Sequence, residues 1–287
     1  RLAARQLVSS GVTASDVVQV CLGSNANRGV SGYALGAEHL EASVIAEEPF
    51  HIDAQLAMLQ NYRPTMLVTT PANALDLMNA MERRHVDPQS LHLRTILLSR
   101  PVSSEMREQL KARLLVAVHC NFGIDEILNP GLCVECEKGR FHVNEDHFLV
   151  ESVNGELVVT TLCREAMPLL RYNTRIACEL SCEKCSCGRT SITLCPGERI
   201  DGRLRVNETP FYKGQITAVL DQSPAAGRPF WIHLNERNVV ISVQITEGLF
   251  SDMMWPLVEL QRNLESELLS RVGIEAEVRF VMRPPEA

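Results

Sequence analysis

The chain has 287 residues, of which 45% are hydrophobic and 22% are charged, and its formal net charge is −7. These values describe an ordinary globular protein that is long enough for two domains. The acidic balance argues against a nucleic-acid-binding surface, because non-specific affinity for a phosphate backbone comes from clustered Lys and Arg. No apolar run approaches the roughly 20 residues that cross a bilayer. We therefore expect a cytoplasmic protein that binds neither nucleic acid nor membrane.

The first half of the chain has the pattern of an α/β fold. An amphipathic helix is predicted over the first residues, and from Val17 to Gly123 short apolar runs alternate with helix-length amphipathic segments. Strands are predicted at 17–21, 42–47, 66–70, 94–99 and 117–123, and helices at 33–40, 53–62, 72–85 and 104–114. Ser103 is placed to cap the last of these helices. The alternation predicts right-handed βαβ units and a mostly parallel sheet.

After Pro130 the apolar period changes to two, which is typical of antiparallel strands. Strands are predicted at 147–153, 155–162 and 168–174, with an Asn154-Gly155 turn between the first two.

A third pattern begins near Gly197. It consists of a possible strand at 202–206, a helix at 213–222, strands at 230–235 and 239–245, a helix at 251–271 and a strand at 275–281. This order suits a small α+β domain of the ferredoxin-like type. We therefore predict a large domain at 1–197 and a small domain at 198–287.

Cysteine and histidine residues gather in the middle of the chain. Cys133-x2-Cys136 is followed by His142 and, about 40 residues later, by Cys182-x2-Cys185-x-Cys187. Two short Cys/His groups that flank a structured segment are typical of a four-coordinate structural zinc site. Six candidates compete for four places, and unliganded thiols are the alternative. Disulfides are disfavoured because an acidic chain without a signal segment is expected in a reducing compartment.

Five ordered blocks carry a family resemblance. They are N-F-G-I-D-E (121–126), C-E-K-G-R-F-H-V-N-E-D-H-F-L-V-E (136–151), G-E-L-V-V-T-T-L (155–162), E-A-M-P-L-L-R-Y-N-T-R (165–175) and C-S-C-G-R-T (185–190). Together they resemble the phenylacetate–CoA ligase branch of the adenylate-forming enzymes. The resemblance implies the fold of those enzymes, with a large nucleotide- and acid-binding domain and a small mobile C-terminal domain. It also implies the activation of an aryl or acyl carboxylate with ATP and Mg2+, followed by acyl transfer to coenzyme A.

The resemblance also implies roles for individual residues. Glu126 would be the catalytic carboxylate that serves Mg2+ and phosphate, and Phe122 would pack on adenine. Asp201 would be the hinge between the domains. The full set of implied nucleotide-binding residues is Phe122, Gly123, Asp125 and Arg199. The implied zinc ligands are Cys136, His142, Cys185 and Cys187, which leaves Cys133 and Cys182 outside the metal site.

Two positions depart from the family pattern. Ile176 stands where the family has an Asp that accepts both ribose hydroxyls, and losing that contact is expected to weaken nucleotide binding about ten- to a hundredfold. Leu98 stands in place of a glycine beside adenine and is expected to crowd the pocket. The family's phosphate loop and catalytic lysine would lie before Arg1 and after Ala287, so we expect residues 1–287 alone not to adenylate.

These observations support two hypotheses of different kinds. The first is an ATP-dependent acid–CoA ligase whose acid the sequence does not name. The second is a degenerate family member that keeps the fold and the zinc but acts as a binding or scaffold protein. A homodimer is compatible with both, whereas a zinc-containing nucleic-acid-binding module is disfavoured by the negative charge.

Overall fold

The computed structural model describes residues 1–22, 30–46, 52–207, 209–234, 238–245 and 255–282. The chain forms two compact units, Arg1–Glu198 and Arg199–Ala287. The division falls one residue after the boundary that the sequence predicts. Within the described ranges, no helix combines the length and the apolar character that a membrane span requires.

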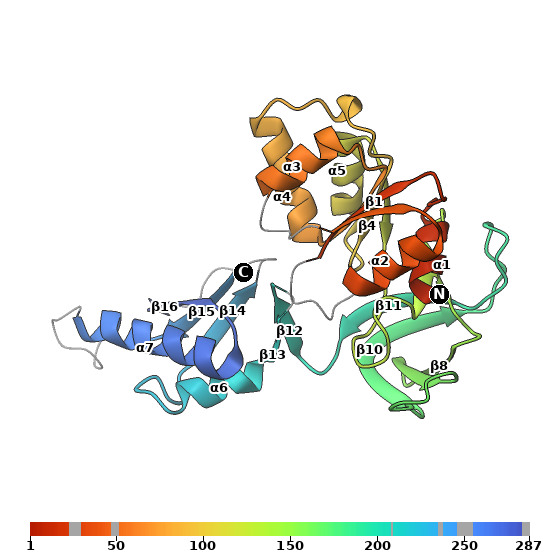
Figure 1. Cartoon of the computed structure of the whole chain (residues 1–287). Helices are drawn as coiled ribbons and strands as arrows, with labels where there is room; N and C mark the ends of the chain where they lie inside the picture. The colour runs from red at the N-terminus through yellow and green to blue at the C-terminus, as the bar shows by residue number, and fades with distance from the viewer. Residues whose placement is uncertain (23–29, 47–51, 208, 235–237, 246–254, 283–287) are drawn as a thin grey trace. The chain divides into compact units, whose positions relative to one another are not determined.

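The first part of the large unit is a five-stranded parallel sheet with the strand order β2-β1-β3-β4-β5 (Figure 1). Its strands are β1 (Val17–Cys21), β2 (Ser43–Ala46), β3 (Met66–Thr69), β4 (Thr95–Leu98) and β5 (Ala117–Cys120). The helices are α1 (Leu2–Ser9), α2 (Val30–His39), α3 (Ile52–Asn61), α4 (Pro71–Arg83) and α5 (Ser104–Leu114), with a 3-10 turn at Pro88–Ser90. The predicted βαβ alternation is thus confirmed. Ser103 caps α5 by accepting a hydrogen bond from the backbone N–H of Met106 at 3.2 Å.

Both faces of this sheet are buried because the strand side chains alternate between two apolar clusters. Val20 and Val68 join a cluster with α1 and α2, whereas Leu67 and Ile96 join the main core with α3, α4 and α5. A helix layer therefore covers each face. This explains why the strands read as continuous apolar runs.

An antiparallel sheet of six strands, in the order β6-β7-β11-β10-β9-β8, completes the large unit. Its strands are β6 (Cys133–Glu135), β7 (Phe141–Val143), β8 (Phe148–Val153), β9 (Glu156–Thr161), β10 (Tyr172–Ser181) and β11 (Thr193–Arg199). Asn154 and Gly155 both have positive φ, at 53° and 79°, as a two-residue type I′ hairpin turn requires. The predicted strand at 168–174 is wrong in its start, because β10 begins only at Tyr172. The sequence did not predict β6, β7 and β11, because the first two are only three residues long and fully buried and so show no alternation.

The small unit contains β12 (Arg203–Val206), β13 (Thr209–Tyr212), α6 (Lys213–Leu220), β14 (Phe230–Leu234), β15 (Val239–Gln244), α7 (Trp255–Val272) and β16 (Ala276–Val281). The central strand β15 is antiparallel to β14 and parallel to β16. β12 pairs with β13 in a separate two-stranded sheet. The ferredoxin-like detail is therefore not confirmed, because β12 does not enter the three-stranded sheet. Residues 251–254 of the predicted helix, and the predicted strand ends Glu47 and Asn235, lie outside the described residues.

Candidate metal cluster and nucleotide loop

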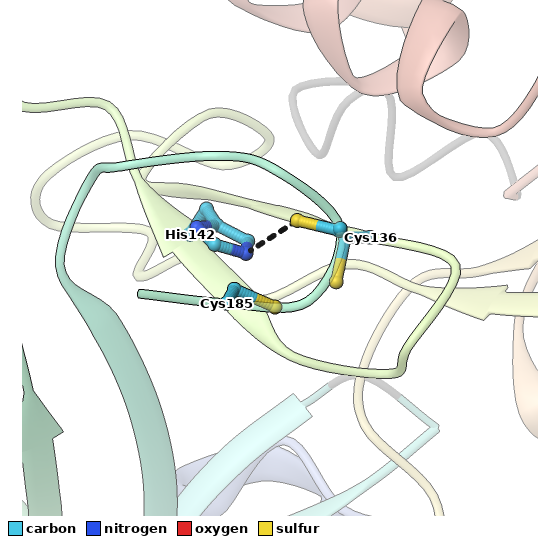
Figure 2. A group of neighbouring side chains, drawn as sticks. Cys136, His142 and Cys185 are labelled. Atoms are coloured by element: carbon cyan, nitrogen blue, oxygen red, sulfur yellow. Dashed lines mark hydrogen bonds between the residues drawn. The ribbon is translucent and has the colours of Figure 1, made fainter. Parts of the chain in front are cut away.

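Four of the six metal-ligand candidates come together in the large unit. Cys136 follows β6, His142 lies on β7, and Cys185 and Cys187 lie in the connection between β10 and β11. Their ligand atoms all lie within 4.8 Å of one another. Figure 2 shows the side chains of Cys136, His142 and Cys185 pointing toward one another. Three sulfurs and one imidazole are thereby gathered from two segments of the chain that are far apart in sequence.

The donor set of the cluster fits a closed tetrahedral site. Cys136 and His142 are each 1% exposed, and Cys185 is 3% exposed. Zinc–sulfur bonds of about 2.3 Å would place two thiolates about 3.8 Å apart, so a small inward rotation of the side chains would suffice. The His142 ring has Nε2 3.4 Å from Cys187 Sγ and Nδ1 3.3 Å from the carbonyl oxygen of Ser191. A backbone acceptor at Nδ1 is the usual partner that orients a metal-binding histidine and leaves Nε2 for the ion.

The pKa shifts at Cys185 and His142 favour the ligand forms, whereas burial raises the pKa of the Cys187 thiol. The backbone N–H of Cys187 lowers the pKa of the Cys185 thiol and so favours thiolate. Burial lowers the pKa of His142 and so favours the neutral ring. Thiolate and neutral imidazole are the forms that bind a metal ion.

The two remaining candidates lie outside the cluster, one in the core and one at the surface. Cys133 is fully buried in the main core, and Cys182 is exposed. Spacing alone does not distinguish them from the other four candidates, because either cysteine of a C-x2-C pair can be a metal ligand. The family resemblance was the available signal, since it implies four ligands that include neither Cys133 nor Cys182.

The N-F-G-I-D-E block begins directly after β5, at the carboxyl edge of the parallel sheet. The backbone N–H of Asn121 donates to the carbonyl of Leu98 at 2.8 Å, and Asn121 Nδ2 donates to the carbonyl of Ser99 at 3.3 Å. The block therefore lies beside the end of β4. In open α/β sheets, ligands bind outside the carboxyl ends of the strands.

Asn129 stabilises the 121–129 loop by hydrogen bonds to other residues of the same loop. Its Oδ1 accepts from Asn121 Nδ2 at 2.7 Å, and its Nδ2 donates to Asp125 Oδ1 at 2.9 Å. A Cβ on Gly123 would come within 2.7 Å of Asn129 Oδ1. Glycine is thus the residue that this close approach allows at position 123.

The aromatic and acidic candidates of the block differ in their surroundings. Phe122 is 7% exposed, and its ring centroid lies 6.0 Å from that of Phe141 with a tilt of 54°. Glu126 is half-buried and lies in a turn from Ile124 to Leu128. Arg164 donates from Nη1 to the carbonyl oxygen of Glu126 at 2.9 Å.

The two positions that depart from the family pattern are both buried. Ile176 is 7% exposed and Leu98 is 0% exposed, and both belong to the main core. Ile176 lies on β10, and Leu98 ends β4 next to Asn121. Neither aliphatic side chain can accept a hydrogen bond from a ribose hydroxyl.

The two candidates near the domain boundary lie together in the small unit. Arg199 donates to both carboxylate oxygens of Asp201 at 3.1 and 2.7 Å, and Asp201 also accepts from the backbone N–H of Arg203 at 3.1 Å. The Arg199 guanidinium lowers the pKa of Asp201. The segment next to the boundary is thus held by a bidentate ion pair.

Sequence reasoning missed a buried charge that links the metal cluster to β5. Glu135 is fully buried, pairs with Arg107 at 2.6 Å and accepts from the backbone N–H of Cys120. The signal was a carboxylate between Val134 and Cys136 in a short buried segment. Asn129 and Arg164 were also missed, because nothing in their local sequence shows that they reach the 121–126 block.

Comparison with solved structures defines the fold. The structure matches that of a 2-hydroxyisobutyryl-CoA ligase in complex with 2-HIB-AMP and CoA, with a TM-score of 0.84 at 19% identity. The match covers 99% of this chain and 66% of that ligase. The fold is therefore that of the adenylate-forming CoA ligases.

Sequence comparison finds relatives that share one name, although no protein-family profile matches the chain. The chain is 30% identical to a phenylacetate–coenzyme A ligase of Thermus thermophilus over 297 aligned residues, which cover 96% of this chain and 64% of that protein. It is 26% identical to the enzyme of the same name from Escherichia coli, with 98% of this chain and 68% of that protein covered. The chain is thus similar in sequence to the phenylacetate–CoA ligases, as the ordered blocks predict.

Proposed function

We propose that the protein containing this chain activates a carboxylic acid with ATP as an acyl-adenylate and transfers the acyl group to coenzyme A. The observation that carries the proposal is the position of the N-F-G-I-D-E block at the carboxyl edge of the sheet, in a chain that aligns over 96% of its length with a phenylacetate–CoA ligase. The chain spans 64% of that relative, and so the activity is proposed for the whole protein.

Each residue of the proposed site has a distinct role. The Glu126 carboxylate would hold Mg2+, which supplies positive charge to the reacting phosphate when it is bound. Phe122, Gly123 and Asp125 would form the wall against the nucleotide. Arg199 would contact the nucleotide as well, and Asp201 would be the pivot about which the small unit moves between the two half-reactions.

The Cys/His cluster is proposed as a structural zinc site. Four buried or half-buried donors, three sulfurs and one imidazole, suit a closed site. Zinc there would tie the β6–β7 hairpin to the β10–β11 connection. None of the ten cysteines forms a disulfide, and a thiolate-rich zinc site suits a reducing compartment such as the cytoplasm.

A specific observation favours a second candidate, a degenerate relative that binds acyl compounds or partners without adenylating. The observation is the burial of Ile176 and Leu98 in the main core, at positions where the family resemblance implies nucleotide contacts. This candidate predicts that ATP neither stabilises the full-length protein nor is consumed by it.

The experiment is an assay of acyl-CoA formation by the full-length protein with ATP, Mg2+, coenzyme A and a panel of aryl and short acyl acids. We expect thioester and AMP to form with at least one acid. No thioester with any acid, together with no thermal shift by ATP, would reject the ligase and favour the degenerate relative.

A further inference from the structure

We infer that Arg164 is a positioning residue that fixes the backbone of Glu126 by donating to the carbonyl oxygens of Glu126 and Ile127. The inference rests on the proposed function, since it deepens the role given there to Glu126. Arg164 lies in the connection between β9 and β10, almost 40 residues from the loop that it contacts.

The turn that carries Glu126 is anchored on both sides. The carbonyl oxygen of Ile124 accepts from the backbone N–H of Ile127 at 2.9 Å and from that of Leu128 at 2.8 Å. The side chains of Ile124 and Ile127 are 4% and 1% exposed, so both belong to the core. Burial holds the side chains of the two isoleucines, and the carbonyl groups of the turn need hydrogen-bond donors in addition.

Arg164 is a donor to two of these carbonyl groups. Its Nη1 group donates to the carbonyl oxygen of Glu126 at 2.9 Å and also to that of Ile127. Hydrogen bonds from an ionised donor are about twice as strong as neutral ones. The peptide groups on the C-terminal side of Glu126 are thereby fixed, and the direction of its Cα–Cβ bond is fixed with them.

The hydrogen bonds of Arg164 do more than stabilise the fold, because they are made at the proposed Mg2+ ligand. Arg164 also lines a cavity of about 620 Å3 together with Ile127, Leu128 and Asn129. The half-buried side chain thus lies between the loop and an open space that water can enter. Loss of Arg164 would free the carbonyl groups to turn toward water, which would let Glu126 move.

The first arm of the test measures the loop in the unliganded chain. Hydrogen exchange is followed in the peptide that spans residues 122–130, for the wild type, R164A, R164K and the control R84A. Among the described residues, Arg84 forms an ion pair with the exposed Asp53. We expect exchange in R164A to rise at least tenfold, with R164K closer to the wild type and R84A unchanged. Unchanged exchange in R164A would overturn the inference.

The second arm measures nucleotide affinity of the full-length protein by calorimetry. ATP is titrated with Mg2+, and AMP is titrated in Mg2+-free buffer without chelator, so that any zinc stays bound. We expect R164A to weaken Mg2+·ATP binding about tenfold and AMP binding less than twofold, and R164K to recover part of the loss. An equal loss for both nucleotides would show a merely structural role and overturn the inference.

The two arms separate failure of the inference from failure of the proposed function. A wild-type protein that binds neither nucleotide would reject the proposed function. In that case the exchange arm still decides whether Arg164 fixes the turn.

Discussion

The Cys/His cluster and the 121–129 loop lie in the same unit, yet they differ in how many of the residues that the family resemblance implies are present. All four donors of the cluster are present, and their ligand atoms lie within 4.8 Å of one another. The 121–126 block is also present at the carboxyl edge of the sheet, but the position implied for the ribose contact is Ile176 in the core. The cluster is complete in itself, whereas the loop needs partners from elsewhere in the chain.

The difference follows from how each site is held. A closed four-donor site fails when a single ligand is lost, because no other group can take the vacant place. A nucleotide site makes many separate contacts, so the loss of one costs only about 1.5–3 kcal/mol. Loss of the ribose contact would therefore leave the fold intact. Loss of a zinc ligand would lower the free energy of unfolding by more.

The largest expected effect is the removal of a cluster ligand. C185S and H142A should each lose zinc and lower the free energy of unfolding by ~5 kcal/mol, because metal binding to such a site contributes directly to folding. The measurement is zinc content by mass spectrometry together with urea denaturation. C182S is the matched control, since Cys182 is exposed and lies outside the cluster. A wild-type chain with less than half an equivalent of zinc would contradict the assignment.

The next effect concerns the link between the two regions, the buried pair Arg107–Glu135. R107M should lower the free energy of unfolding by ~3 kcal/mol, because Glu135 is fully buried and would keep an unpaired charge. The double variant R107M/E135Q should recover part of this loss, since the charge is then gone. The measurement is the denaturation curve of each variant, which gives the two free energies of unfolding for comparison. A single variant as stable as the double one would show that the pair does not join the regions.

A smaller effect is expected when the carboxylate is restored at the ribose position. I176D should lower the free energy of unfolding by ~2 kcal/mol, because Ile176 packs in the main core and a carboxylate there loses its hydration. I176V is the control and should lose ~1 kcal/mol. If I176D were as stable as I176V and bound AMP more tightly, the position would belong to an open nucleotide pocket after all.

The smallest effect is expected at Asn129. N129A removes the hydrogen bonds to Asn121 and Asp125 and should lower the free energy of unfolding by ~1 kcal/mol. The change should appear as faster hydrogen exchange confined to the 121–129 loop. Uniformly faster exchange across the large unit would show that Asn129 supports the fold as a whole and not the loop.

Much of the fold could be predicted, because the parallel strands read as apolar runs between amphipathic helices. The Asn154-Gly155 turn was predictable for a local reason, since both residues tolerate positive φ. The short strands β6 and β7 could not be found, because three buried residues carry no period. The pairing of β12 with β13 was also hidden, since pairing between strands depends on contacts distant in sequence.

The candidate site was predictable only where residue types alone define it. Cys and His at short spacing indicated a metal cluster, and the resemblance chose Cys136, His142, Cys185 and Cys187 from the six candidates. No such signal marks Arg164, whose role appears only when the β9–β10 connection is seen beside Glu126. The burial of Ile176 likewise depends on the main core around β10.

The most direct test of the account is ATP–pyrophosphate exchange by the full-length protein, comparing the wild type with E126Q. The account predicts acid-dependent exchange by the wild type and a loss of at least a hundredfold in E126Q, because the amide cannot supply the negative charge that holds Mg2+. E126Q should keep its zinc and its unfolding midpoint. Equal exchange by the two proteins, or none by the wild type with any acid, would contradict the account.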